Sequence, residues 1–99
     1  STGGCRIITA VLQVIANVID FHMPIDRAVA APRLHNQWQP DETYAEPGFA
    51  ADVLEALKRR GHNIVATEPY TAANSIAVTP QGYVGAADAR TQGALATGY

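Results

Sequence analysis

The first six residues of the chain, Ser1 to Arg6, contain the groups best suited to chemistry. Gly3 and Gly4 are adjacent and lie directly before an apolar run with helical spacing. A helix start leaves backbone N–H groups without intrahelical partners, at the positive end of the helix dipole. Such groups bind an anion or a developing oxyanion. Gly3 and Gly4 are therefore our candidate catalytic residues. The simpler alternative is that the two glycines are only a flexible segment before the helix.

The other reactive side chains stand alone in the sequence. Cys5 is near the predicted helix start, a position that favours a reactive thiolate, but no neighbour supplies the oriented base that a cysteine enzyme needs. We expect Cys5 to be a small, partly buried structural residue. The three histidines, His22, His35 and His62, are too far apart for a local metal-binding motif. We expect no metal site and no cofactor.

The composition indicates one small domain with a thin core. The chain has 99 residues, of which 47% are hydrophobic and 16% are charged. A composition this apolar is typical of a chain whose surface is covered by another part of a protein. The net charge is -2 and the seven lysines and arginines are scattered. Nucleic acids and anionic membranes are therefore not expected as partners.

Signals for export and membrane spanning are absent from these residues. The longest apolar stretch lies between Arg6 and Asp20 and contains Gln13 and Asn17, so it is too short and too polar to cross a bilayer. No basic segment leads into a short apolar run with a cleavage site. The single cysteine cannot form an internal disulfide and does not settle the compartment.

Three helices are predicted from apolar periodicity and from their end signals. The residues from Ile7 to Ile19 have polar positions at steps of three or four, which indicates a helix with a wide apolar arc. A short helix over Ile25 to Ala30 lies between two prolines. A third helix starts at Ala50, has basic residues in its last turn and ends before Gly61.

Four strands are predicted, over Leu34 to Trp38, Ile64 to Thr67, Ser75 to Thr79 and Tyr83 to Ala87. The last two are expected to form a hairpin. The segments 40–42 and 47–48 read as a polar loop and a turn, and the tail from residue 89 has no period. We expect an α+β fold in which the third helix packs on a small, mostly antiparallel sheet.

Eight short motifs, taken in order, are similar to one protein family. They are Gly3-Gly4-x-Arg6-Ile7-Ile8-Thr9, Ala31-Pro32-Arg33-x-His35-x-Gln37-Trp38, Pro40-Asp41-Glu42, Glu46-Pro47-Gly48-Phe49, Gly61-His62, Ala73-Asn74-Ser75-Ile76, Gly85-Ala86-Ala87-Asp88-x-Arg90 and Gly98-Tyr99. In this order they resemble the C-terminal part of the small subunit of the γ-glutamyltranspeptidases. The resemblance runs from Gly3 to Tyr99 without a large gap.

The resemblance implies part of the αββα sandwich of the N-terminal nucleophile hydrolases, an α+β fold with helices packed on a mostly antiparallel sheet. Residues 1–99 would be a C-terminal fragment of the small, catalytic subunit and a single partial domain. The family's nucleophile is an N-terminal Thr, created by self-cleavage and activated by its own α-amine. It belongs upstream of these residues. Gly3 and Gly4 match the glycines whose N–H groups form the oxyanion hole.

The implied reaction transfers the γ-glutamyl group of glutathione or a similar donor to an amino acid, a peptide or water. The isolated chain is expected to be inactive, because the nucleophile and the residues that grip the donor belong upstream. Implied partners are the rest of the small subunit, the large subunit, the donor and the acceptor. Self-association of the isolated chain is a further expectation. The resemblance also implies a periplasmic, extracellular or cell-surface location for the parent.

Two other functions stay open at this point. The related glutaryl and cephalosporin acylases share the architecture and an oxyanion hole, and the residues that distinguish them belong upstream. A non-catalytic assembly module is the second alternative, in which the apolar helix over Ile7 to Ile19 docks on a partner chain.

Several residues depart from the family pattern or suggest a framework role. Thr2 and Ala89 stand where relatives often have proline, and Cys5 stands where they have a small residue such as Ser. Ser1 lies too close to the glycine pair to be the expected nucleophile. We expect Arg33 and Trp38 to form a stacking or ion-pair brace. We expect Asp88 and Arg90 to pair with each other or with upstream carboxylates.

Overall fold

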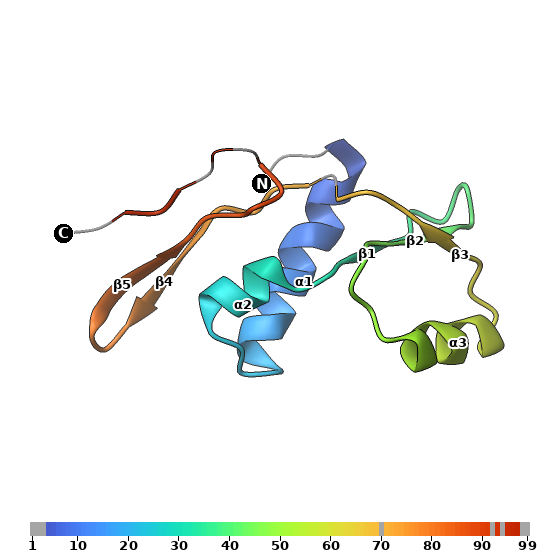
Figure 1. The fold of residues 1–99 in the computed structure, drawn as a ribbon, viewed down its shortest axis with the longest axis horizontal. Coiled ribbons are helices and arrows are strands. Elements are labelled where there is room, and N and C mark those ends of the chain that lie inside the picture. The colour runs from blue at the N-terminus through green and yellow to red at the C-terminus, as the bar shows by residue number, and fades with distance from the viewer. Residues whose placement is uncertain (1–3, 70, 92, 94, 98–99) are drawn as a thin grey trace. The chain divides into compact units, whose positions relative to one another are not determined.

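The computed structural model describes residues 4–69, 71–91, 93 and 95–97. The chain divides into two compact units, one built from the described residues within 1–31 and 70–99 and the other from residues 32–69. Each unit has its own helix and sheet elements, which Figure 1 labels.

The first unit begins with a helical pair. A 3₁₀ turn, η1 (Gly4–Arg6), leads into helix α1 (Ile7–Ile19), which has the predicted bounds. The chain then turns through His22, at φ 56°, into helix α2 (Ile25–Ala30), again as predicted. The amide of Asn17 donates to the carbonyl of Ala28 over 3.3 Å. This bond ties the two helices together in the polar stripe of α1.

Strands β4 (Ser75–Thr79) and β5 (Gly82–Ala86) form the antiparallel hairpin of the first unit, with Ser75 opposite Ala86 and Thr79 opposite Gly82. The predicted range of the second strand, Tyr83 to Ala87, lies one residue further along the chain than the observed β5. The hairpin contacts α2, and α2 contacts α1. The first unit is therefore a hairpin with helices on one of its sides (Figure 1).

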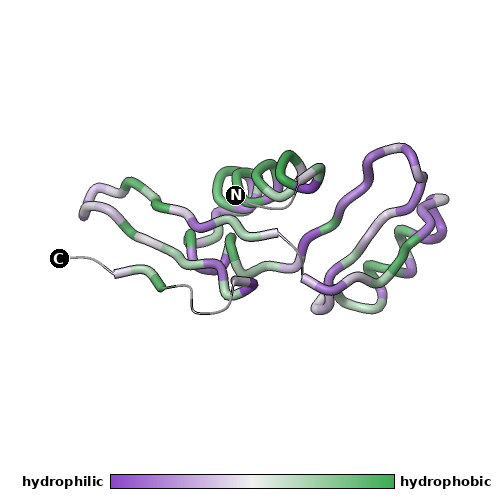
Figure 2. Tube along the Cα trace, turned by 90° about the horizontal axis from the view of Figure 1, so that it is seen from above, coloured by the Kyte–Doolittle hydropathy of each residue, from purple (hydrophilic) through white to green (hydrophobic). Residues whose placement is uncertain are grey.

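The hydrophobic core of the first unit is small. Among the described residues of this unit, the core cluster consists of five buried residues: Val14, Ala28, Val29, Ala73 and Ala86. Most of the apolar arc of α1 lies outside it, because Ile8 is 77% exposed and Leu12 is 62% exposed. In Figure 2 this helix is coloured mostly as hydrophobic. The predicted thin core and large uncovered apolar surface are both found.

The second unit is a three-stranded sheet with one helix. Strands β1 (Leu34–His35), β2 (Thr43–Ala45) and β3 (Ile64–Ala66) lie in the order β1-β2-β3, and helix α3 (Ala51–Arg59) contacts β3. Strand β2 was not predicted, and β1 is shorter than its predicted range.

The pairing of β2 with β3 is parallel, with Tyr44 opposite Val65, whereas β1 and β2 are antiparallel. A parallel pair needs a crossover connection, and α3 supplies it. Gly61, at φ 97°, follows the helix, and its N–H donates to Lys58 O over 3.0 Å. The mostly antiparallel sheet predicted beneath α3 is therefore a mixed sheet, while the α+β class is confirmed.

Within the described residues, no helix has the length and apolar character needed to cross a membrane.

Candidate functional site

The predicted oxyanion site lies at the start of the first unit. Gly3 falls outside the described residues. Gly4 opens η1 with φ 58°, a conformation that side-chain-bearing residues rarely adopt. A Cβ added at Gly4 would meet no atom of the described residues within 4 Å. Gly4 is therefore an exposed, left-handed backbone position with open space beside it.

The helix start next to Gly4 has no compensating side chain within the described part of the chain. Arg6 is the N-cap of α1 and makes no side-chain capping bond, and the first turn holds no acidic residue. The positive end of the helix dipole is thus not neutralised locally. Backbone N–H groups in this setting can stabilise negative charge on a reacting oxygen.

Cys5 lies inside η1 and is exposed. The expectation that it is partly buried is wrong, because no described segment covers this face of the turn.

The histidines are not assembled into a metal site. His22 and His62 are exposed, whereas His35 is 7% exposed and its Nε2 lies 3.0 Å from Gln37 Oε1. The ring of His35 stacks on Tyr44 with centroids 6.4 Å apart. Among the described residues, no three His, Cys, Asp or Glu side chains are grouped so that they could hold a metal ion.

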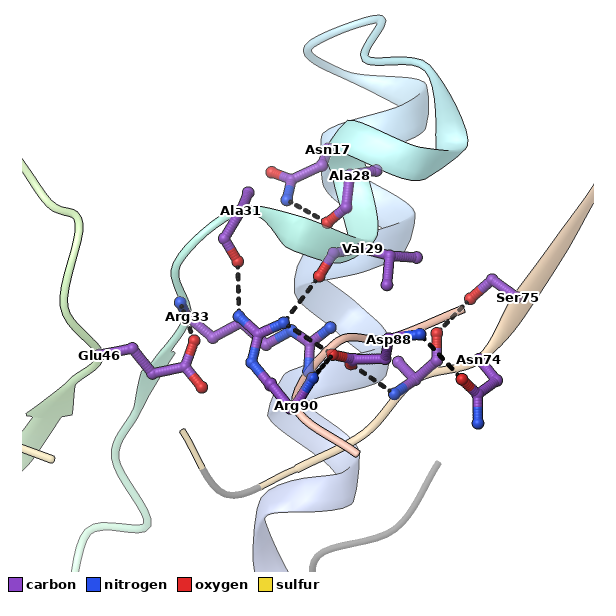
Figure 3. Close-up of polar contacts among 11 residues, drawn as sticks. Asn17, Ala28, Val29, Ala31, Arg33, Glu46, Asn74, Ser75, Asp88 and Arg90 are labelled. Atoms are coloured by element: carbon purple, nitrogen blue, oxygen red, sulfur yellow. Dashed lines mark hydrogen bonds and ion pairs between the residues drawn. The ribbon is translucent and has the colours of Figure 1, made fainter. Parts of the chain in front are cut away.

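Asp88 and Arg90 form a buried ion pair in the first unit (Figure 3). Arg90 Nη1 lies 3.1 Å from Asp88 Oδ1, and the Asp88 side chain is fully buried. Asp88 Oδ2 also accepts the N–H of Ala73 over 2.8 Å, and the side chain of Asn74 accepts the N–H of Asp88 over 2.8 Å. The predicted pairing is confirmed, and it anchors the base of the hairpin.

The guanidinium of Arg90 also holds the end of α2. It donates to Val29 O and to Ala31 O, each over 2.9 Å. These carbonyls belong to the last turn and the C-cap of the helix, where a cation is favoured by the dipole. The sequence indicated that Arg90 and Asp88 pair. It carried no signal for these carbonyls, which lie about sixty residues earlier in the chain.

Arg33 and Glu46 are coupled in the second unit. The N–H of Arg33 donates to Glu46 Oε1 over 2.9 Å, and the N–H of Glu46 donates to Arg33 O over 3.1 Å. Arg33 is 4% exposed, whereas Trp38 is 76% exposed. The brace expected between Arg33 and Trp38 stays a prediction, and the contacts described between Arg33 and Glu46 involve the main chain of Arg33.

Trp38 lies at the centre of a tight turn. It has φ 73°, and the N–H of Gln39 donates to Gln37 O over 2.8 Å, which closes a three-residue turn around it. The side chain of Asn36 accepts the N–H of Trp38 over 2.7 Å. This turn ends β1 early and explains why the strand stops at His35.

Comparisons with known proteins agree with the motif pattern. The family model described as gamma-glutamyltranspeptidase matches residues 1–98. The glutathione hydrolase proenzyme of Escherichia coli (strain K12) is 43% identical over 100 residues, which cover 100% of this chain and 17% of that protein. The corresponding proenzyme of Pseudomonas sp. (strain A14) is 36% identical and covers 98% of this chain and 19% of its own length.

Solved structures are similar over nearly the whole chain. A Helicobacter pylori γ-glutamyltranspeptidase T380A mutant aligns over 92% of this chain with a TM-score of 0.78 and 46% identity. The γ-glutamyltranspeptidase of Pseudomonas nitroreducens, complexed with L-DON, aligns over 99% with a TM-score of 0.85 and 32% identity. This chain spans about half of those solved chains, 52% and 53%, and less than a fifth of the curated relatives.

Proposed function

Because this chain belongs to the γ-glutamyltranspeptidase family, we propose that it works in a parent enzyme that moves the γ-glutamyl group of glutathione-like donors. The acceptors would be amino acids, peptides or water, and the acyl group would be carried by the N-terminal Thr that precedes this region in the family. Relatives at 43% and 36% identity are glutathione hydrolases by name, which supports this donor class.

The part played by this chain is the oxyanion hole, supplied by the N–H groups of Gly3 and Gly4. The observation that carries this assignment is the left-handed backbone of Gly4, in open space, beside a helix start without a side-chain cap or a first-turn acid. Attack on the γ-glutamyl carbonyl places negative charge on its oxygen. Fixed N–H groups stabilise that charge more than the neutral carbonyl, so they lower the barrier.

The chain alone would be inactive. An oxyanion hole stabilises a tetrahedral intermediate only after a nucleophile has attacked, and the activating α-amine belongs to the same upstream Thr. Ser1 falls outside the described residues, and its place two positions before Gly3 matches the family's glycine loop and not its nucleophile.

The partners would be the rest of the small subunit and the large subunit. The exposed apolar side chains of α1 support a covering partner, because Ile8, Leu12 and Ile19 are 77%, 62% and 64% exposed. Uncovered aliphatic surface of this kind favours association, including self-association when the chain is alone. The same surface is what an assembly module would need. The acylase alternative has no comparable support, because the relatives described above carry γ-glutamyltranspeptidase and glutathione hydrolase names.

A chimera tests the oxyanion assignment. The segment of the Escherichia coli relative that matches this chain would be replaced by these 99 residues, and hydrolysis of a γ-glutamyl anilide would be followed. We expect activity in the chimera and none with the chain alone. Gly4→Ala should lower kcat by about 100-fold with little change in KM, because a Cβ at positive φ displaces the N–H groups.

Gly61→Ala is the matched control. Gly61 also has positive φ and open space around its Cβ position, but it follows α3 in the other unit. Both substitutions strain the backbone, and only Gly4→Ala should reduce kcat. Equal loss of kcat in the two variants, or full activity of Gly4→Ala, would contradict the assignment.

We also propose that the parent acts outside the cytoplasm, in a periplasm, at the cell surface or in the medium. The support is the family resemblance. Fractionation of cells that express the parent would test it, and activity confined to the cytoplasmic fraction would contradict it.

A further inference from the structure

Carbonyls near the end of α2 accept hydrogen bonds from side chains of other segments. In a longer helix the N–H of residue 32 would donate to Ala28 O, but Pro32 has no N–H. The amide of Asn17, in α1, donates to this carbonyl over 3.3 Å instead (Figure 3). The next carbonyl, Val29 O, accepts from the guanidinium of Arg90 over 2.9 Å. Side chains from two distant segments therefore complete the end of this short helix.

The two donors connect α2 to different parts of the first unit. Asn17 belongs to α1, whereas Arg90 follows β5 and is paired with buried Asp88. The carbonyl of Asn17 also accepts the N–H of Met23 over 2.9 Å, in the turn between the two helices. The elements make contact in the same order, because α1 contacts α2, and α2 contacts both β4 and β5. Helix α2 thus lies between α1 and the hairpin in this chain of contacts.

Apolar packing alone defines the angle between α1 and α2 weakly. The buried residues of α1 are Ala10 and Val14, and those of α2 are Ala28 and Val29. Burial of such small side chains is favourable but has no preferred direction. A hydrogen bond, in contrast, requires its donor and acceptor to lie within a narrow range of distance and angle. The bond from Asn17 therefore restrains the helix angle in a way that the small core does not.

Helix α1 carries the candidate oxyanion site at its other end. Gly4 opens η1, and η1 leads directly into Ile7, the first residue of α1. At a rise of about 1.5 Å per residue, Asn17 lies about 15 Å along the helix from Ile7. A tilt of about 4° at the Asn17 end would therefore move the helix start by about 1 Å, and a displacement of that size can cost about 100-fold in rate.

We propose that Asn17 is a positioning residue of the parent enzyme, which sets the direction of α1 and thereby the place of the Gly4 N–H beside the reacting carbonyl. The inference rests on the proposed function of Gly4 above. In this role Asn17 acts through the helix and not on the substrate. Loss of its amide should slow the chemical step and leave binding of the donor unchanged, because the oxyanion forms only after the donor has bound.

The test uses the chimera with the Escherichia coli relative described above, with Gly4→Ala and Asn17→Leu made singly and together. Asn17→Leu keeps a side chain of similar size and a good helix former, and it removes the donor. We expect kcat to fall by about tenfold and KM to stay unchanged. An unchanged kcat in Asn17→Leu, beside a slow Gly4→Ala, would overturn the positioning role and leave the oxyanion assignment intact.

The double variant distinguishes positioning from a general loss of structure. If Asn17 acts through Gly4, the two effects are not additive, and the double variant should be about as slow as Gly4→Ala alone, about 100-fold below the chimera. Independent effects would multiply to about 1000-fold, and that result would overturn the proposal. Full activity of Gly4→Ala would overturn the proposed function itself, and the positioning role would fall with it.

Thr43→Val is the matched control for the loss of one hydrogen bond. Thr43 lies in β2 of the other unit, is 7% exposed and accepts the amide of Asn36 over 3.0 Å. The substitution keeps the side-chain shape, and kcat measured well below the lowest Tm of the set should not change. An equal fall in kcat for Thr43→Val and Asn17→Leu would contradict positioning. Asn17→Ala, which removes the amide without adding bulk, replaces Asn17→Leu with the same expectations if the leucine variant does not fold.

Discussion

Arg90 joins the buried carboxylate of Asp88 to the end of α2, with Nη1 3.1 Å from Asp88 Oδ1 and 2.9 Å from Val29 O. One guanidinium thus connects the base of the hairpin with a helix that is distant in sequence. The Asp88 side chain is fully buried and the Arg90 side chain is 10% exposed. This pair is the principal polar connection described in the first unit.

Removing the cation should be strongly destabilising. Arg90→Met would leave the Asp88 carboxylate buried without its cation and the α2 carbonyls without donors, so we expect a loss of about 3–5 kcal/mol in the free energy of unfolding. Guanidinium denaturation of the chimera would measure it. Lys58→Ala breaks an exposed pair with Glu55, 3.6 Å apart, and should cost less than about 1 kcal/mol. Similar losses in the two variants would contradict a structural role for Arg90.

Two valines of the first unit provide a test of where the core ends. Val29 is fully buried and Val78 is 78% exposed. Val29→Ala should lower the free energy of unfolding of the isolated chain by about 2 kcal/mol, because methyl groups leave a packed site. Val78→Ala should stay within about 0.5 kcal/mol of the parent chain. Equal effects, measured by urea denaturation, would mean that the core boundary is misplaced.

Trp38 holds a left-handed conformation that its side chain disfavours. Glycine adopts φ 73° without that strain, so Trp38→Gly should stabilise the second unit or leave it unchanged, with a gain of up to about 1 kcal/mol. Thermal unfolding would report it as a higher Tm. Glu68→Gly, at an exposed loop position without positive φ, should lower Tm because glycine adds entropy to the unfolded chain. A marked drop in Tm for Trp38→Gly would show that the exposed indole contributes packing.

The apolar ridge of α1 should drive self-association of the isolated chain. Leu12 is 62% exposed, and Ile8 and Ile15 lie four residues before it and three after it on the same side of the helix. Leu12→Lys should shift the chain toward monomer in sedimentation velocity, because a charge replaces apolar contact area. Gln13→Lys adds the same charge on the polar stripe and should not. An unchanged sedimentation profile for Leu12→Lys would exclude this ridge as the contact.

The helices were largely predictable because their signals are local. The polar spacing of α1 and the prolines around α2 reproduce the observed bounds of both helices, and α3 ends before its glycine as expected. The hairpin was predictable for the same reason, since turn residues separate two β-like runs. In each case neighbours within a few residues determine the conformation.

Strand β2 and the parallel pairing were not predictable in this way. Thr43 to Ala45 is only three residues long and lies between a polar loop and a turn, so it has no period of its own. It becomes a strand because β1 and β3 supply hydrogen-bonding partners on both sides. The early end of β1 likewise depends on Asn36 and the turn at Trp38.

The amino-acid sequence by itself determined the helices and indicated the glycine pair as a candidate site, because both depend on residue type and local spacing. The family and its α+β fold followed from the resemblance of the ordered motifs to a known family. Only the tertiary structure decided that Cys5 is exposed, that Glu46 bonds the main chain of Arg33, and that Arg90 holds the end of α2. These features depend on contacts between residues far apart in the chain, and burial is a property of such contacts that local spacing does not encode.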